Sequence, residues 1–171
     1  MGMLVEQLLE LARTENATLS TERIDLSRLV SGEVLPFESV AFEHGLVINS
    51  RIADDIEVEG NASQLRQLVA ILLDNAIRYG KAEGAVHLTL SREHGGAVLS
   101  VINSADEIPA LQRERIFERF YRVDTARNGE DKHYGLGLPI AKAIVNAHRG
   151  HIGVRCFDGL IEFRVDLPAT R

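Results

Sequence analysis

The sequence predicts an α/β two-layer sandwich, and the prediction rests on how its apolar residues recur. Between Asn61 and Tyr79 they return at the three- and four-residue spacing of an amphipathic helix. Residues 85–102 and 152–167 instead alternate apolar with polar side chains, and each stretch is interrupted by a glycine-containing turn. This pattern is typical of β-hairpins with one face in the core. Strands covered by helices on one side form two layers.

Length and composition predict one domain with a core and a short appendage. The chain has 171 residues, 45% of them hydrophobic, and a net charge of −6, which argues against a broad nucleic-acid-binding face. Cys156 is the single cysteine, so a disulfide framework and a cysteine-based zinc site are excluded. No apolar run approaches the length of a membrane span, and no signal peptide opens the sequence. These features fit a reducing, cytoplasmic compartment.

The first half of the chain divides into an appendage, a linker and the start of the domain. Residues 1–14 predict a short amphipathic helix that needs a packing partner, because a lone helix of this length is marginal in water. Residues 15–23 are polar and predict a linker, so the domain is expected to span residues 24–171. A helix follows from Asp25 to His44, in which Pro36 is expected to cause a kink or a split. Two short strands are expected next, at residues 46–52 and 56–58.

The helix from Asn61 to Tyr79 combines a core stripe with a polar edge. Asn61 is a suitable N-cap, and Gly80 is a suitable stop. On a helical projection Asn75 lies beside the apolar stripe, between Tyr79 and Arg78. An edge that passes from an aromatic ring to an amide to a guanidinium suits a ligand with a flat apolar end and an anionic end. Alternatively, Asn75 hydrogen-bonds a loop and Arg78 is simply solvated.

A second stretch, residues 133–140, carries complementary chemistry. Gly135 and Gly137 lead into a helix, and Pro139 fits its first turn. Glycines allow close backbone approach, and the free N–H groups of a helix start attract phosphate. Taken alone, such a pair of glycines is more often a tight loop. Residues 122–134 predict either a disordered segment or a functional lid.

Three motifs together resemble those of the ATP-binding catalytic domain of bacterial sensor histidine kinases, the GHKL or HATPase_c family. LLDNAIRYG resembles the N box, IFERFYRVD the F box and GLGL the G2 box, in the same order and spacing. The resemblance implies a Bergerat-type fold, in which a mixed, mostly antiparallel sheet is covered on one face by about three helices. It also implies a protein-histidine kinase of a two-component system that uses ATP and Mg²⁺.

The same resemblance implies partners that this sequence does not supply. Residues 1–14 look like the end of the second helix of the dimerisation and phosphotransfer hairpin. None of the six histidines stands in an H-E-x-x-x-P setting, so the phosphoacceptor is expected outside this sequence. The implied partners are that hairpin, a downstream response regulator and, in a full-length membrane-bound receptor, a second copy. A fragment with only a remnant of the hairpin is also compatible with a monomer.

The resemblance implies specific roles in the site for residues of these motifs. Asn75 is expected to act catalytically through Mg²⁺, while the backbone from Gly135 to Leu138 cradles the phosphates. Phe117 and Phe120 are expected to tie the lid to the core. The expected ATP-binding residues are Asn75, Arg78, Tyr79, Asn103, Ile108, Arg122, Gly135, Leu136, Gly137 and Leu138. Among them, Arg78 and Arg122 would contact phosphate, Asn103 would accept from the exocyclic amine, and Tyr79, Ile108 and Leu136 would wall the purine pocket.

The sequence departs from the family where adenine is read. The G1 box is usually Asp-x-Gly-x-Gly, and here the matching positions are Asn103, Ala105 and Glu107. If either glycine position needs positive φ, its side chain costs about 1 kcal/mol or more. An inward Glu107 would also repel an anionic ligand. Ile71, where many relatives have Asn, and His133, where the lid often has Gly, are further departures. The alternative to a kinase is therefore a non-catalytic nucleotide-binding or interaction module with an altered G1 loop.

Overall fold

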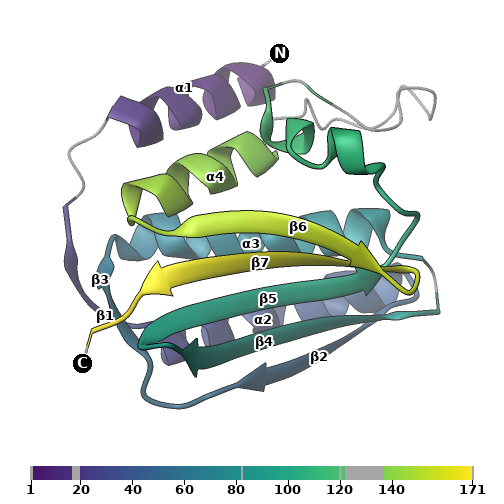
Figure 1. Ribbon diagram of the computed structural model, residues 1–171, viewed down its shortest axis with the longest axis horizontal. Coiled ribbons are helices and arrows are strands. Elements are labelled where there is room, and N and C mark those ends of the chain that lie inside the picture. The colour runs from purple at the N-terminus through teal and green to yellow at the C-terminus, as the bar shows by residue number, and fades with distance from the viewer. Residues whose placement is uncertain (1, 17–19, 82, 120, 122–136, 171) are drawn as a thin grey trace.

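The computed structural model describes residues 2–16, 20–81, 83–119, 121 and 137–170 (Figure 1). The elements in chain order are α1 (Gly2–Asn16), β1 (Glu22–Asp25), α2 (Leu26–Glu43), β2 (Val47–Ile52), β3 (Glu57–Gly60), α3 (Ala62–Tyr79), β4 (Ala85–Glu93), β5 (Gly96–Ser104), the short 3₁₀ helices η1 (Ala110–Gln112) and η2 (Arg115–Phe117), α4 (Gly137–Ala147), β6 (His151–Phe157) and β7 (Leu160–Pro168).

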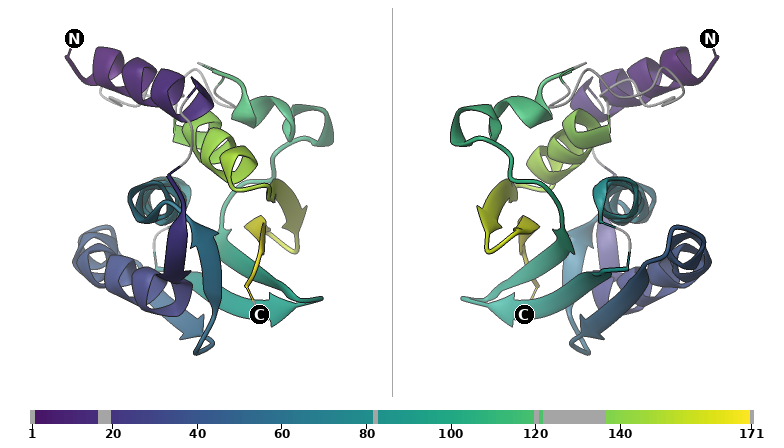
Figure 2. Two further views of the ribbon diagram at one scale, coloured as in Figure 1. Left: turned by 90° about the vertical axis from the view of Figure 1, so that its left-hand side faces the viewer. Right: turned by 90° about the vertical axis from the view of Figure 1, so that its right-hand side faces the viewer.

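The main sheet has five strands in the order β2-β4-β5-β7-β6. The β2–β4 pair is parallel and the other three pairs are antiparallel. Helices α2, α3 and α4 cover one face of this sheet, and α1 packs on the outside of α4 (Figures 1 and 2). The predicted two-layer sandwich with a mixed, mostly antiparallel sheet is confirmed. A separate ribbon pairs β1 with β3.

Two hairpin turns have the backbone that their sequences predict. His94 and Gly95 both have positive φ, at 51° and 78°, and so do Asp158 and Gly159, at 49° and 76°. Two consecutive residues with positive φ give a turn whose twist matches the flanking strands. These turns bring β4 against β5 and β6 against β7.

Helix α3 supplies the centre of the core. Asn61 caps its start by accepting a hydrogen bond from the N–H of Gln64 at 3.0 Å, and the helix ends before Gly80, as predicted. Its apolar stripe is almost completely buried and comprises Leu65, Leu68, Val69, Leu72, Leu73, Ala76 and Ile77. The helix is held in place by this stripe, so the residues beside it are also fixed relative to the sheet.

Two predictions about the first half of the chain need correction. Helix α2 is continuous across Pro36, so of the predicted kink or split, the split is excluded. The proline ring opposes the carbonyl of Gly32, and because both residues are exposed, water can hydrogen-bond that carbonyl. The linker was expected to reach residue 23, but Glu22–Asp25 forms β1. Only Ile24 in that strand is buried, so no alternating pattern marked it.

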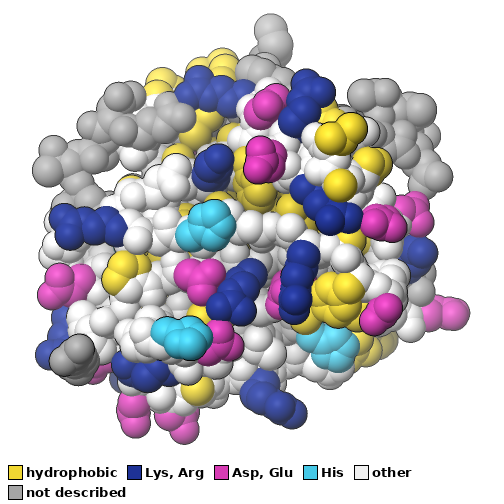
Figure 3. All heavy atoms as spheres, in the orientation of Figure 1, with side chains coloured by type: hydrophobic (Ala, Val, Ile, Leu, Met, Phe, Trp, Pro, Cys, Tyr) yellow, Lys and Arg dark blue, Asp and Glu magenta, His cyan; other side chains and the backbone are white. Residues whose placement is uncertain are grey.

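The outer face of the main sheet is polar. Figure 3 shows basic, acidic and histidine side chains interspersed over β4 to β7. Arg155 pairs with Glu162, whose carboxylate also accepts from the Ser100 hydroxyl at 2.6 Å. His87 lies exposed on this face. Cys156 is half-buried. Within the described ranges, no helix has the length and apolar character needed to cross a membrane.

Candidate functional site

The candidate site lies at the end of the sheet where α3 and β5 end and α4 begins (Figure 1). A Cβ added to Gly137, the first residue of α4, would lie 3.6 Å from Cγ2 of Ile71 on α3. Asn75 is one helical turn beyond Ile71 and therefore shares its face of α3. The face of α3 that carries Asn75 thus lies beside the start of α4, although the two segments are far apart in sequence.

Asn75 is half-buried at this junction. No described residue makes a hydrogen bond with its side chain, so the loop contact considered as an alternative has no counterpart within the described ranges. A half-buried amide without a partner among the described residues offers one carbonyl oxygen and one NH₂ group to a ligand.

Arg78 and Tyr79 follow on the last turn of α3. The Nε atom of Arg78 lies 3.8 Å from a carboxylate oxygen of Asp74, which is too long for a hydrogen bond. The Tyr79 residue is 51% exposed. Arg78 is exposed on this last turn, so an anion can reach its guanidinium.

The end of β5 is tied to the end of α3. The N–H of Lys81 donates to the carbonyl of Ser104 at 2.9 Å, which joins the two elements just beyond Gly80. Asn103 is 3% exposed, and its Nδ2 atom donates to the Ser104 carbonyl at 3.3 Å. This side chain therefore lies on the core side of the sheet beneath the end of α3.

The G1 loop has no glycine, and its backbone is unstrained at Ala105 and Glu107. Neither Ala105 nor Glu107 has positive φ, so the conformational cost considered for them does not arise. Ala105 is buried, and its N–H donates to the carbonyl of Gly159 at 3.2 Å. The Glu107 carboxylate accepts a hydrogen bond from Nη2 of Arg113 at 3.0 Å.

The F-box region packs on the core beside α4. The ring of Phe117 meets that of Phe163 edge to face, with centroids 6.3 Å apart at 85°. Lys142 of α4 lies 5.8 Å from the centre of the Phe117 ring. Ile108 is 9% exposed and joins the same core. Phe117 therefore packs into the core, as predicted.

Several predicted site residues lie outside the described residues. These are Arg122, Gly135 and Leu136, together with Phe120, His133 and the expected lid at residues 122–134. Gly137 and half-buried Leu138, on the first turn of α4, are described.

None of the sequence motifs indicated a structural role for His148. Its Nε2 atom accepts from the N–H of Asn61 at 3.0 Å, and Nδ1 donates to the carbonyl of Ile144 at 2.7 Å. Burial lowers the pKa of His148, and the hydrogen bond to Ile144 opposes this only in part. The neutral ring links the end of α4 to the start of α3. The one sequence feature related to this contact is Gly60, because the Cβ of any larger residue there would lie 2.4 Å from the His148 ring.

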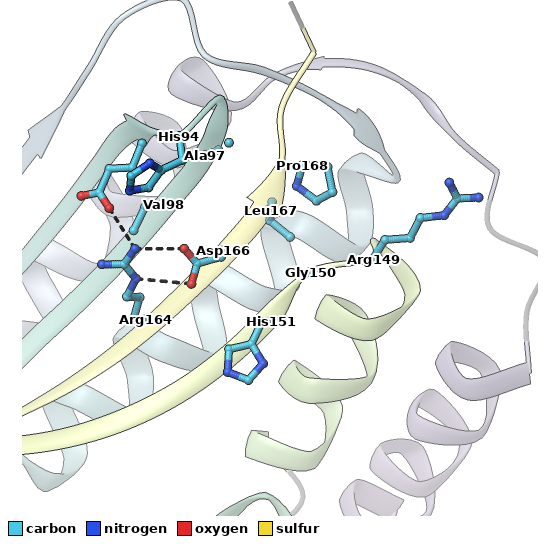
Figure 4. Close-up of a pocket in the computed structure, with 12 residues that line it drawn as sticks. His94, Ala97, Val98, Arg149, Gly150, His151, Arg164, Asp166, Leu167 and Pro168 are labelled. Atoms are coloured by element: carbon cyan, nitrogen blue, oxygen red, sulfur yellow. Dashed lines mark hydrogen bonds and ion pairs between the residues drawn. The ribbon is translucent and has the colours of Figure 1, made fainter.

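A hollow on the outer sheet face lies at the opposite end of the strands from the candidate site. In Figure 4 Arg164 bridges two carboxylates, donating to Glu93 at 2.8 Å and to Asp166 at 3.1 Å. These hydrogen bonds raise the pKa of Arg164. The labelled side chains of His151 and Arg149 point away from this cluster. Since these charged groups are paired with one another, the hollow offers a ligand few free charged groups.

Among the described residues, no group of three or more His, Cys, Asp or Glu side chains could hold a metal ion.

Comparison with known proteins relates the whole arrangement to sensor kinases. The chain is 34% identical over 170 residues to the sensor protein DltS of Streptococcus agalactiae, covering 98% of this chain and 43% of the relative. It is 35% identical over 168 residues to the sensor protein CutS of Streptomyces coelicolor, covering 97% of this chain and 40% of the relative. The chain thus spans less than half the length of these relatives.

Solved structures share the fold over nearly the whole chain. Full-length ShkA in complex with AMPPNP superposes with a TM-score of 0.85 at 28% identity, covering 98% of this chain and 35% of that one. The histidine kinase AdeS of Acinetobacter baumannii has a TM-score of 0.81 at 23% identity, covering 99% of this chain and 79% of that one, and shows the fold alone. Residues 60–171, which include α3, the G1 loop and α4, match the family described as histidine kinase-, DNA gyrase B- and HSP90-like ATPases. The chain belongs to this family of ATPases, with a histidine-kinase type of catalytic fold.

Proposed function

We propose that this chain is the ATP-binding catalytic domain of a two-component sensor histidine kinase. It would donate the γ-phosphate of ATP to a histidine on a helical hairpin outside this sequence. The observation that supports the proposal is that Ile71, one turn before Asn75 on α3, lies beside Gly137 at the start of α4. One site there would combine an amide oxygen, a helix N-terminus and the basic residue Arg78.

The phosphates would lie at the start of α4. The helix has eleven residues from Gly137 to Ala147, and its first N–H groups and dipole favour an anion. Arg78 and Arg122 would add positive charge on either side, and the backbone from Gly135 to Leu138 would approach the phosphates closely. No β-branched side chain stands at residues 135–138 to prevent that approach.

Asn75 fits a Mg²⁺ ion that arrives with the nucleotide. Mg²⁺ binds few protein oxygens and keeps several waters, so a single half-buried amide suffices where an all-protein cage would not. When bound, the ion would neutralise charge on the phosphate oxygens. Asn75 would orient the phosphates relative to the incoming acceptor.

The purine would lie toward the end of β5. Asn103 and Ile108 are both buried there, so an amide acceptor and an apolar wall are already ordered. Tyr79 and Leu136 would close the other side of the pocket. Half-exposed Tyr79 can reorient toward a ring with little loss of packing.

The domain would act as one part of a larger receptor. Phosphoryl transfer depends mostly on positioning and charge neutralisation, so the domain needs no nucleophile of its own. The acceptor histidine would lie on the dimerisation hairpin of a membrane-bound homodimer, whose second helix would end in residues 1–14. A response regulator would then receive the phosphoryl group, and this domain would lie on the cytoplasmic side.

Titration with a fluorescent ATP analogue, with and without Mg²⁺, tests this proposal. The wild type should show saturable, Mg²⁺-dependent binding. The Asn75→Ala variant should bind the Mg²⁺ form roughly tenfold or more weakly, since even outer-shell metal partners typically contribute that much. Asn49→Ala, which changes an exposed residue on the edge strand β2, is the matched control.

Two results would contradict the proposal. Wild-type protein that fails to saturate at millimolar nucleotide would leave only a non-catalytic interaction module. Unchanged affinity and unchanged Mg²⁺ dependence in Asn75→Ala would remove Asn75 from the site.

A further inference from the structure

The loop after β5, residues 105–109, carries two adjacent carboxylates where relatives of this family have glycine-rich backbone. We propose that Arg113 is a positioning residue that makes this loop compatible with an anionic nucleotide. It holds the Glu107 carboxylate outward and fixes the carbonyl of Ile108. The inference rests on the proposed function, because it concerns the same nucleotide site.

One guanidinium makes both contacts. Nη2 of Arg113 donates to the Glu107 carboxylate at 3.0 Å, and Nε donates to the Ile108 carbonyl at 3.0 Å. Arg113 directly follows η1, so its side chain reaches back over the loop. The rigid, planar fork of arginine fixes both acceptors in one plane, which a flexible lysine ammonium would not do.

The two carboxylates of the loop differ in how firmly they are held. Asp106 pairs with Lys81 at 3.4 Å, and both side chains are largely exposed, at 85% and 59%. The Arg113 side chain is only 27% exposed and has a second, backbone partner. Exposed ion pairs contribute little, whereas a partly buried guanidinium with two acceptors is more strongly ordered. Of the two cations, Arg113 therefore determines the conformation of the loop.

The residues on both sides of Glu107 are fixed, so its side chain has few other ways to move. Ala105 is held by its hydrogen bond to Gly159, and Ile108 has its side chain in the core. The Ile108 carbonyl also lies 3.9 Å from the Cys156 sulfur. Rotation of the Glu107 side chain itself is thus the main freedom that Arg113 removes.

The consequence is electrostatic. Without Arg113, the negative charge of Glu107 stands uncompensated beside the proposed nucleotide site, and like charges repel over a Debye length of about 8 Å at physiological ionic strength. We expect the loss of affinity to be about 3- to 10-fold for ATP. The loss should be smaller for ADP, which carries less charge, and smaller at high salt.

The test is a set of four variants measured for ATP and ADP affinity by calorimetry at low and high salt. Arg113→Ala should weaken ATP binding more than ADP binding, and Glu107→Gln should bind ATP at least as tightly as the wild type. The Arg113→Ala/Glu107→Gln double variant should regain most of the lost affinity. Arg23→Ala, which removes an exposed arginine–glutamate pair on the β1–β3 ribbon, is the matched control and should change nothing.

If Arg113→Ala fails to fold, Arg113→Gln replaces it, because glutamine can still donate to the Ile108 carbonyl while lacking the charge. The inference is overturned if the wild type binds ATP and removal of Arg113 leaves the affinity unchanged. It is equally overturned if the loss is the same for ATP and ADP and is not rescued by Glu107→Gln, because that result describes a merely structural residue. A wild type that binds neither nucleotide would overturn the proposed function itself and this inference with it.

Discussion

Replacing Gly60 by alanine should destabilise the domain through a single histidine ring. A Cβ at residue 60 would lie 2.4 Å from Cδ2 and 2.5 Å from Nε2 of His148. Contacts this short are not tolerated, so the ring must leave its position. It then loses the hydrogen bonds with the N–H of Asn61 and the carbonyl of Ile144.

The size of the effect follows from those two bonds. Each contributes about 1 kcal/mol net, and leaving a buried donor or acceptor without a partner adds roughly 1–3 kcal/mol. We therefore expect Gly60→Ala to lower the free energy of unfolding by about 2–4 kcal/mol. For a domain of this size, about 2–4 °C is lost per kcal/mol, so Tm should fall by roughly 5–15 °C.

Thermal and urea unfolding followed by circular dichroism measure this change. Gly32→Ala is the matched control, because a Cβ there meets nothing within 4 Å and the residue is exposed in the middle of α2. Alanine is the better helix former by roughly 0.5–1 kcal/mol, so this variant should be as stable as the wild type or more stable. Both variants replace glycine by alanine, so a difference between their stabilities reflects the surroundings of the two glycines.

A double variant decides whether the ring is responsible. In a His148→Ala background the clash no longer exists, so adding Gly60→Ala should cost much less than it does in the wild type. Additive losses, or a Gly60→Ala variant as stable as the wild type, would refute the role given to the His148 ring.

Two further predictions concern the core and its pH dependence. Because burial lowers the pKa of His148 below its unfolded value near 6.5, its neutral ring should contribute fully above that pH and lose its contribution as pH falls below it. Urea unfolding at pH 7.5 and 5.5 should therefore show a larger loss on acidification for the wild type than for His148→Ala, and equal losses would contradict this linkage. Leu72→Ala should lower the free energy of unfolding by roughly 2–5 kcal/mol, because Leu72 is 0% exposed at the centre of α3. Leu111→Ala, at a residue that is 92% exposed, should change it by less than about 0.5 kcal/mol, and similar effects in both variants would argue against the core assigned to α3.

Much of the fold was predictable because its signals are local. The stripe of α3 repeats with the period of a helix, and its caps, Asn61 and Gly80, stand at its two ends. Both hairpins carry their alternation and their turn residues within one short stretch. Where a strand carried no such pattern, as in β1, prediction failed, because that strand is defined by its pairing with β3.

The candidate site residues could be predicted from motifs, whereas the residues that hold the site in place could not. Asn75 and Gly137 belong to motifs that resemble the N box and the G2 box, and Ile71, one turn before Asn75, lies beside Gly137. Arg113 lies outside the three motifs, so the sequence did not identify it. Its specific bonds to Glu107 and Ile108 depend on how η1 folds back, which residue types alone do not specify.

By itself the sequence determined the periodicities, the caps and the glycine positions, which are properties of neighbouring residues. From these followed the α/β sandwich and the two motifs on helices α3 and α4, which pack side by side on one face of the sheet. Tertiary structure alone decided which distant polar groups are paired. Packing brings the His148 ring to the N–H of Asn61, and the turn at η1 brings the Arg113 guanidinium to the Glu107 carboxylate. Burial and hydrogen bonding between distant segments set these outcomes, and neither is encoded in any single stretch of the chain.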